Sequence, residues 1–325
     1  MNKVTYLEAI NQGLEIILKN NKNSFLIGED IGEHGGAFGV TRGLFEKLGK
    51  DKVIDMPISE NSFVGMAIGA SLVGYRVIIE IMFIDWITLA MDQIINIAAK
   101  LYYISGGQYN VPIVIRVPQG GGGRKGTAAN HSQSLESLFM NIPGLKVVFP
   151  SNPHDAKGLL MSSFKDENPV IFIEHKNLYS EKGNIPDEEI YYVPIGKGNL
   201  KKEGKDITVI SAGRYVNVLM DIADKVENID MEIIDLVSLK PIDEEIIINS
   251  IKKTGRVLLV QEAPLICGFA AEIISLINEK AFDYLDAAPK RVCGKDVPVP
   301  YCTSQEKNVF PSENEIIEAI HDLYK

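Results

Sequence analysis

Residues 53–80, VIDMPISENSFVGMAIGASLVGYRVIIE, decide the fold of the chain, because they contain a strand, a helix and a second strand. Residues 53–55 and 76–80 are short apolar runs, and residues 62–73 carry small or apolar side chains around the whole helical circumference. A helix without a polar face is buried. Gly65 and Gly69 lower helix propensity and therefore indicate close packing inside the domain or across a subunit interface. The stretch predicts one βαβ unit of a parallel sheet.

The same alternation continues on both sides of this unit. Further strands are expected at residues 25–27, 112–117, 146–149 and 170–174, and a second buried helix at residues 86–102. Residues 181–204 are rich in Gly, Pro and charged side chains and are predicted to be a linker. A second α/β pattern follows, with strands at 207–211, 231–235 and 257–261 and helices at 216–225, 243–253 and 269–279. The sequence therefore predicts an α/β fold of two doubly wound domains, residues 1–180 and 205–325.

Composition and charge exclude several classes of protein. The 325 residues include 33 Lys and Arg against 43 Asp and Glu, a formal net charge of −10, which argues against binding to nucleic acid or to an acidic membrane surface. No apolar run reaches the roughly 18 to 20 residues of a membrane-spanning helix, and the N-terminus lacks the pattern of a signal peptide. Cys267, Cys293 and Cys302 have no C-x-x-C spacing, so neither a disulfide framework nor a zinc site is indicated. A cytoplasmic location is expected.

Glu60 lies between a strand and a buried helix, where open α/β sheets bind ligands. An isolated glutamate in the first turn of a helix more often complements the helix dipole. The alternative is a partly buried carboxylate with a raised pKa, which could exchange a proton with a ring nitrogen. Both interpretations stay open on the sequence alone.

Trp86, the single tryptophan, follows the strand at 76–80 in the segment EIMFIDW, residues 80–86. Aromatic side chains at such places usually belong to the core. An indole at the carboxyl end of a strand would alternatively offer a flat surface to a heteroaromatic ring.

A glycine-rich segment, PQGGGGRKGT at residues 118–127, precedes His131. It lacks the G-x-x-x-x-G-K-[ST] arrangement of a phosphate-binding loop, so a mobile active-site loop is the favoured interpretation. His131 is the only one of five histidines that follows such a loop near the carboxyl edge of the sheet, although a neutral surface histidine is an equal alternative. No H-E-x-x-H or G-x-S-x-G motif is present.

The chain resembles, nearly from end to end, the β subunits of thiamine-diphosphate-dependent 2-oxo acid dehydrogenases, and five segments carry this resemblance in the expected order. They are GED at 28–30, DMPISE at 55–60, DQIIN at 92–96, ANHSQSLE at 129–136 and PSNPHDAKG at 150–158. The resemblance implies a transketolase-like pyrimidine-binding domain followed by a transketolase C-terminal domain.

The resemblance also implies roles for particular residues. Glu60 matches the glutamate that hydrogen-bonds N1′ of the cofactor's aminopyrimidine and promotes its imino form, while Met82 and Trp86 fall at cofactor-contacting positions. His131 matches the histidine that assists proton transfer and acylation of the lipoyl group. Backbone oxygens that hold potassium in some relatives match Ile113, Ser163, Phe164, Asp166 and Asn168.

The chain has no Gly-Asp-Gly motif for magnesium and diphosphate. The resemblance therefore implies that a separate α subunit holds magnesium, that two α and two β subunits form the active enzyme, and that a lipoyl-bearing acyltransferase accepts the acyl group. The segments EHKNLY at 174–179 and GGAFGVT at 35–41 look most like acetoin dehydrogenase β subunits, with pyruvate and branched-chain 2-oxo acid dehydrogenases as alternatives. Two other hypotheses are a non-catalytic assembly module and a one-chain transketolase-like enzyme, the latter disfavoured by length and by the missing motif.

Overall fold

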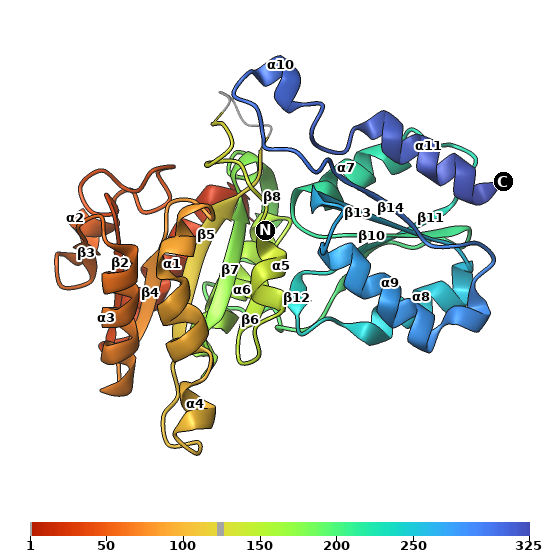
Figure 1. Ribbon diagram of the computed structural model, residues 1–325. Helices are drawn as coiled ribbons and strands as arrows, with labels where there is room; N and C mark the ends of the chain where they lie inside the picture. The colour runs from red at the N-terminus through yellow and green to blue at the C-terminus, as the bar shows by residue number, and fades with distance from the viewer. Residues whose placement is uncertain (1, 122–126) are drawn as a thin grey trace. The chain divides into compact units, whose positions relative to one another are not determined.

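The computed structural model describes residues 2–121 and 127–325, which form two compact units. The first unit consists of the residues up to Gln119 together with Leu138–Ile195, and the second of Gly120–Ser137 together with Gly196–Lys325. Each unit has an α/β architecture in which helices cover a β-sheet (Figure 1). No helix in the described ranges is long and apolar enough to cross a membrane.

The first unit is built on a parallel sheet with the strand order β6-β7-β5-β4-β2-β3. The strands are β2 (Ser24–Gly28), β3 (Val53–Asp55), β4 (Arg76–Glu80), β5 (Ile113–Gln119), β6 (Lys146–Val148) and β7 (Val170–His175). Every residue of β5 and β7 is buried. Their Val and Ile side chains suit a pleated sheet covered on both faces, which is why the apolar runs predicted all six strands.

The helices of the first unit begin where the sequence supplies capping groups. Before α1 (Tyr6–Asn20), Thr5 and Glu8 form a reciprocal capping box, and before α6 (Pro153–Lys165) the Asn152 side chain accepts a hydrogen bond from the backbone N–H of Asp155 at 3.0 Å. The helices α1 and α6 pack against each other, whereas α3 (Glu60–Leu72) packs on β4. Short helices and a second small sheet complete the chain up to Ile195: α2 (Leu44–Leu48), α4 (Leu101–Ile104), α5 (Glu136–Met140), η3 (Lys176–Leu178), and the antiparallel pair β1 (Asn2–Thr5) and β8 (Lys182–Ile185).

The helix predicted at residues 86–102 is not one α-helix, so this prediction is wrong. The structure has a 3₁₀-helix, η1 (Trp86–Ala90), a π-helix, η2 (Gln93–Ala98), and then α4. The backbone N–H of Ala99 donates to the carbonyl of Ile94 at 3.0 Å, the i to i+5 spacing of a π turn. Apolar periodicity indicates which side chains are buried but cannot distinguish i+3, i+4 and i+5 hydrogen bonds.

The second unit has the sheet order β14-β13-β10-β11-β9, parallel except for β9 at the edge. Its strands are β9 (Asn199–Lys202), β10 (Ile207–Ser211), β11 (Met231–Asp235), β13 (Val257–Pro264) and β14 (Lys290–Gly294), and β12 (Ser238–Lys240) follows β11. Its helices are α7 (Arg214–Ala223), α8 (Glu244–Thr254), α9 (Phe269–Lys280), η4 (Phe282–Tyr284), α10 (Thr303–Glu306) and α11 (Glu313–Tyr324). In Figure 1, α7 and α11 cover one face of this sheet and α8 and α9 the other.

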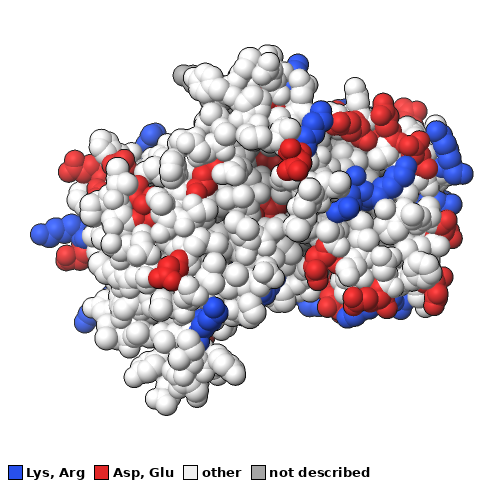
Figure 2. All heavy atoms as spheres, in the orientation of Figure 1, with Lys and Arg blue, Asp and Glu red and all other residues white. Residues whose placement is uncertain are grey.

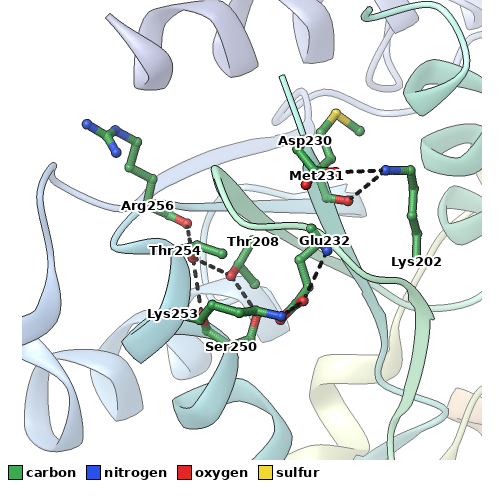
Figure 3. A network of polar contacts seen from close by, with 10 residues as sticks. Lys202, Thr208, Asp230, Met231, Glu232, Ser250, Lys253, Thr254 and Arg256 are labelled. Atoms are coloured by element: carbon green, nitrogen blue, oxygen red, sulfur yellow. Dashed lines mark hydrogen bonds and ion pairs between the residues drawn. The ribbon is translucent and has the colours of Figure 1, made fainter. Parts of the chain in front are cut away.

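A network of hydrogen bonds and one ion pair connects α8 to the second sheet (Figure 3). Thr208 of β10 shares hydrogen bonds with Ser250 at 2.6 Å and with Thr254 at 2.7 Å, both from α8. Lys253 pairs with the buried carboxylate of Glu232 on β11. Because each buried polar group has a partner, the helix gains a defined position without a desolvation penalty.

The chain divides differently from the predicted boundaries at 180 and 205. Residues 181–204, predicted to be a linker, contain β8 and β9, one in each unit. Residues 120–137 fall within the first predicted domain but belong to the second unit. Both differences arise from long-range contacts, which a local sequence pattern does not record.

Charged side chains of both signs lie side by side on the surface of the second unit (Figure 2). Lys225 pairs with Glu313 at 2.5 Å and Lys290 pairs with Asp322 at 3.3 Å, all four exposed. Exposed pairs of this kind add less than about 1 kcal/mol to stability. The face drawn therefore carries mixed charges instead of one large basic field.

Candidate functional site

The candidate site lies at the carboxyl edge of the first sheet, around the end of β2. The register places Gly28, the last residue of β2, beside Asp55 of β3 and Glu80 of β4. The chain continues from β2 to β3 on one side, whereas β4, on the other side, is followed by β5. Such a reversal of strand order is where doubly wound sheets bind ligands.

Two buried carboxylates lie at this edge. Glu29 follows β2 and is 8% exposed, and Glu60 is the first residue of α3 and is 7% exposed. Burial raises the pKa of Glu29, the negative charge of Glu60 raises it further, and a hydrogen bond from the backbone of Ser59 opposes these effects. The Oε1 atom of Glu29 is buried and accepts no hydrogen bond from the described residues. Glu29 is therefore protonated more readily than an exposed glutamate.

A close contact holds the two loops of this edge together. The backbone N–H of Gly32 donates to Oδ1 of Asp55 at 2.7 Å. A Cβ atom at position 32 would lie 2.4 Å from Oδ2 of the same carboxylate, so only glycine allows this approach. The contact brings the loop after β2, with Glu29, next to the segment that leads to Glu60.

Met82 and Trp86 follow β4 at the same edge, and both are half-buried. The backbone N–H groups of Ile81 and Ile84 donate to the carbonyls of Arg116 and Pro118 on β5, which fixes the path of this segment. Trp86 begins η1, which packs against α3. The structure thus places Glu60, Met82 and Trp86 at one edge of the sheet, with Glu60 and Trp86 each at the first position of a helix. Their roles stay predictions.

An aromatic cluster adjoins Met82. The ring centroid of Phe38 lies 5.3 Å from that of Phe83 and 5.4 Å from that of Tyr179. Phe38 belongs to the segment at 35–41 and Tyr179 to the segment at 174–179. The two segments that favour acetoin therefore contact each other, and Phe38 also contacts Phe83, the residue after Met82.

Sequence reasoning missed a buried ionic network beneath this edge. The guanidinium of Arg116 pairs with Glu80 at 2.7 Å and with both oxygens of Glu174, at 2.7 Å and 3.0 Å, and Tyr179 donates to Glu174 at 2.7 Å. Burial alone would lower the pKa of Arg116, but the charges of Glu174 and Glu80 outweigh it and raise that pKa. The network ties β4, β5 and β7 together. Charged residues inside otherwise apolar strands were the sequence signal for it.

His131 belongs to the second unit, whereas the residues of the sheet edge belong to the first. It is half-buried, and its Nδ1 lies 2.9 Å from Oδ1 of Asn130. An amide oxygen only accepts hydrogen bonds, so this contact fits the tautomer that carries its proton on Nδ1. Ala128, whose carbonyl accepts from the His131 backbone at 3.3 Å, has φ of 65°, a left-handed conformation that turns the chain sharply. Residues 122–126 of the glycine-rich segment lie outside the described residues.

The positions predicted to hold potassium lie in the first unit, at the start of β5 and around the end of α6. They are Ile113, Ser163, Phe164, Asp166 and Asn168. Nη1 of Arg76 donates to the backbone oxygens of Phe164 and of Asp166, at 2.9 Å each. Potassium binding here stays a prediction. Two of the backbone oxygens that would bind the ion also accept hydrogen bonds from the guanidinium of Arg76. Within residues 2–121 and 127–325, no three His, Cys, Asp or Glu side chains cluster as metal ligands.

Comparisons with known proteins agree with this architecture. Residues 2–182 match the family model of the transketolase pyrimidine-binding domain and residues 196–316 that of the transketolase C-terminal domain, which confirms the predicted fold. A solved structure described as a split gene transketolase, inactive β4 tetramer, is similar with a TM-score of 0.79. It covers 99% of this chain and 98% of its own at 20% identity, so this likeness concerns the fold alone.

Three curated relatives are similar over nearly their whole length. The pyruvate dehydrogenase E1 component subunit beta of Rickettsia felis is 41% identical, covering 98% of this chain and 97% of its own. The acetoin:2,6-dichlorophenolindophenol oxidoreductase subunit beta of Bacillus subtilis is 40% identical with the same coverage. The 2-oxoisovalerate dehydrogenase subunit beta of Bacillus subtilis is 41% identical, covering 99% of this chain and 99% of its own. The three identities are too similar to separate the substrates.

Proposed function

Because the chain belongs to the family of E1 β subunits of thiamine-diphosphate-dependent 2-oxo acid and acetoin dehydrogenases, we propose that it cleaves acetoin together with an α subunit and passes the acyl group to lipoamide. Pyruvate or a branched-chain 2-oxo acid is the alternative substrate. The single observation that carries the proposal is the buried carboxylate pair of Glu29 and Glu60 at the carboxyl edge of the first sheet.

The residues of this edge fit the aminopyrimidine of the cofactor. Thiamine diphosphate, when bound, supplies the carbon nucleophile and the electron sink for cleaving a carbon–carbon bond next to a carbonyl. In the proposal, Glu60 exchanges a proton with N1′ of the aminopyrimidine. Glu29 is a second carboxyl group at the same edge that can bind a proton. Met82 and the indole of Trp86 would hold the ring and exclude water from it.

His131 is proposed to act in the later transfer to lipoamide. The contact of its Nδ1 with Oδ1 of Asn130 fits the tautomer with the proton on Nδ1, in which Nε2 is the basic nitrogen. A neutral imidazole can both accept and return a proton near neutral pH. Magnesium and the diphosphate would be held by the α subunit, since the chain lacks a Gly-Asp-Gly motif. Two α and two β subunits, a lipoyl-bearing acyltransferase as acceptor and a cytoplasmic location complete the proposal.

The acetoin assignment is supported by the cluster beside Met82. Phe38 contacts both Phe83 and Tyr179, so the two acetoin-like segments adjoin the cofactor-contacting position. An aromatic wall of this kind suits the methyl groups of a small uncharged hydroxyketone.

The test is to co-express the chain with an α subunit of the same family and to measure thiamine-diphosphate-dependent reduction of an artificial electron acceptor. Acetoin, pyruvate and 3-methyl-2-oxobutanoate are supplied separately, and the chain without α subunit is the control. Activity with acetoin, and none without α, supports the proposal. Activity with one of the 2-oxo acids alone would overturn the substrate, and activity of the isolated chain would overturn the shared active site.

A non-catalytic assembly module is the alternative from another class. In a Glu60→Ala complex of unchanged subunit composition, unchanged turnover would favour it, whereas loss of turnover favours catalysis.

A further inference from the structure

We propose that Glu262, at the end of β13, is a positioning residue for His131. One oxygen of its carboxylate accepts hydrogen bonds from Gly121 and from Ser134, which stand before and after the histidine in the chain. The inference rests on the proposed role of His131 and names a residue that neither the sequence motifs nor the sheet-edge site includes.

Two pairs of contacts close the base of this loop, all within the second unit. The backbone N–H of Gly120 donates to the carbonyl of Gln133 at 3.0 Å. One residue further on each side, the backbone N–H of Gly121 donates to Oε1 of Glu262 at 2.8 Å, and the hydroxyl of Ser134 donates to the same oxygen at 3.2 Å. The carboxylate thus joins the segment before the loop to the segment after it.

Glu262 is itself held in place. It is 7% exposed and belongs to β13, a strand paired on both sides in the second sheet. Nη1 of Arg214 lies 3.8 Å from its other oxygen, Oε2. Hydrogen bonds to an ionised acceptor are stronger than neutral ones, and they gain further strength where water is excluded.

The first end of the loop is also fixed by shape. A Cβ atom on Gly121 would lie 2.1 Å from Cζ of Phe310, so position 121 accepts only glycine unless the ring moves. Phe310 is buried and packs with Val299 and Val309 in a small apolar cluster. Position 121 therefore needs glycine if its backbone N–H is to reach Glu262 while the Phe310 ring keeps its position.

Packing alone does not hold the segment around His131. A cavity of about 300 Å³ lies beside it, lined by Ala129, Ser132 and Leu135 on one side and by Glu262, Val297 and Phe310 among the residues opposite. A side chain or loop next to empty space lacks the contacts that fix its position. Thr127 contacts the His131 carbonyl and the Ser132 hydroxyl within this segment, and the polar clamp at Glu262 connects the segment to β13. In the proposal, loss of the clamp lets the imidazole move.

Hydrogen exchange of the full-length chain tests the clamp without any activity. In Glu262→Ala we expect amides of residues 127–137 to exchange about tenfold faster or more, the ratio that follows from losing a hydrogen bond to a charged group. Glu262→Gln should exchange more slowly than Glu262→Ala, because its carbonyl oxygen can accept the same two hydrogen bonds, although without the charge that strengthens them. Arg214→Gln is the matched control, since it removes the counter-charge and leaves the acceptor in place. Amides of β10 and α11 report whether the unit remains folded.

Unchanged exchange at residues 127–137 in Glu262→Ala would overturn the clamp. If that variant does not fold, Gly121→Ala takes its place, because it displaces the same end of the loop from the carboxylate. Normal exchange in a folded Gly121→Ala chain would overturn the clamp equally.

The second measurement compares two reactions of the assembled αβ complex. Glu262→Ala should lower acyl transfer to lipoamide about as much as His131→Ala, change reduction of the artificial acceptor less than about threefold, and add nothing to His131→Ala in the double variant. Glu262→Gln should restore the transfer. Faster exchange with normal transfer would overturn the positioning role, whereas normal transfer in His131→Ala would instead contradict the proposed role of the histidine.

Discussion

Replacing Arg116 by methionine should destabilise the first unit strongly. The guanidinium is 1% exposed and stands between Glu80 and Glu174, whose side chains are 6% and 0% exposed. Methionine is uncharged and replaces the aliphatic part of the arginine side chain, so the substitution removes the cation and leaves two carboxylates buried without it. The effect should therefore come from unpaired charge more than from a cavity.

The magnitude follows from this arrangement. Removing one partner of a buried ion pair costs about 3–5 kcal/mol, because the remaining charge stays desolvated. For a unit of this size, 1 kcal/mol corresponds to a shift in Tm of roughly 2–4 °C. We therefore expect Arg116→Met to lower the Tm of the transition that includes the first unit by about 6–20 °C at neutral pH. The loss of Tm should be smaller under acidic conditions, because burial raises the pKa of Glu174 and its carboxylate then takes up a proton.

Differential scanning calorimetry of the full chain measures this shift. Lys225→Met is the matched control, because it breaks an ion pair with Glu313 whose side chains are 53% and 49% exposed and should change stability by less than about 1 kcal/mol. Replacing Arg116, Glu80 and Glu174 together by apolar residues should recover most of the loss, since no buried charge would remain. Equal shifts for Arg116→Met and Lys225→Met would refute the reasoning.

Three further outcomes are expected. Burial and the charge of Glu60 raise the pKa of Glu29, so its ionised form destabilises the folded chain as pH rises through that pKa. Glu29→Gln should therefore raise Tm at pH 7. A gain in Tm that is equally large at about pH 4 would contradict this. His131→Ala should reduce acyl transfer to lipoamide by roughly 10²–10⁴-fold with artificial-acceptor activity retained, and a loss under about threefold would exclude the histidine from the transfer. Arg76→Gln removes the hydrogen bonds from Arg76 to the backbone oxygens of Phe164 and Asp166. Replacing choline chloride by potassium chloride should therefore raise the Tm of this variant more than the Tm of wild type. Equal shifts in Tm would argue against a potassium site there.

Much of the fold could be predicted because parallel strands are buried on both faces. The runs at 76–80 and 112–117 are apolar for this reason, and their positions match β4 and β5. The π-helix η2 could not be predicted, because its buried positions fit an ordinary helix equally well. The placement of residues 120–137 in the second unit depends on contacts such as that of Gly121 with Glu262, 141 residues away in sequence.

The candidate site was predictable only in part. Glu60 and Trp86 stood out because they follow strands and begin helical segments, the usual place of ligand contacts in open α/β sheets. Glu29 was not singled out, since its raised pKa depends on burial against a loop 30 residues away. Arg116 was missed because a single charge inside an apolar strand shows no partner until the strand order is known.

The central claim is that the Glu60 carboxylate activates thiamine diphosphate in the αβ complex. The most direct measurement is the rate at which the thiazolium C2 proton of the bound cofactor exchanges with deuterium, compared between wild type and Glu60→Gln. Glutamine keeps the size of the side chain but cannot take up or release the proton. We expect the exchange rate to fall by roughly 10²–10⁴-fold, the range for loss of a positioned acid–base group, with cofactor binding retained. An exchange rate within about threefold of wild type would contradict the account.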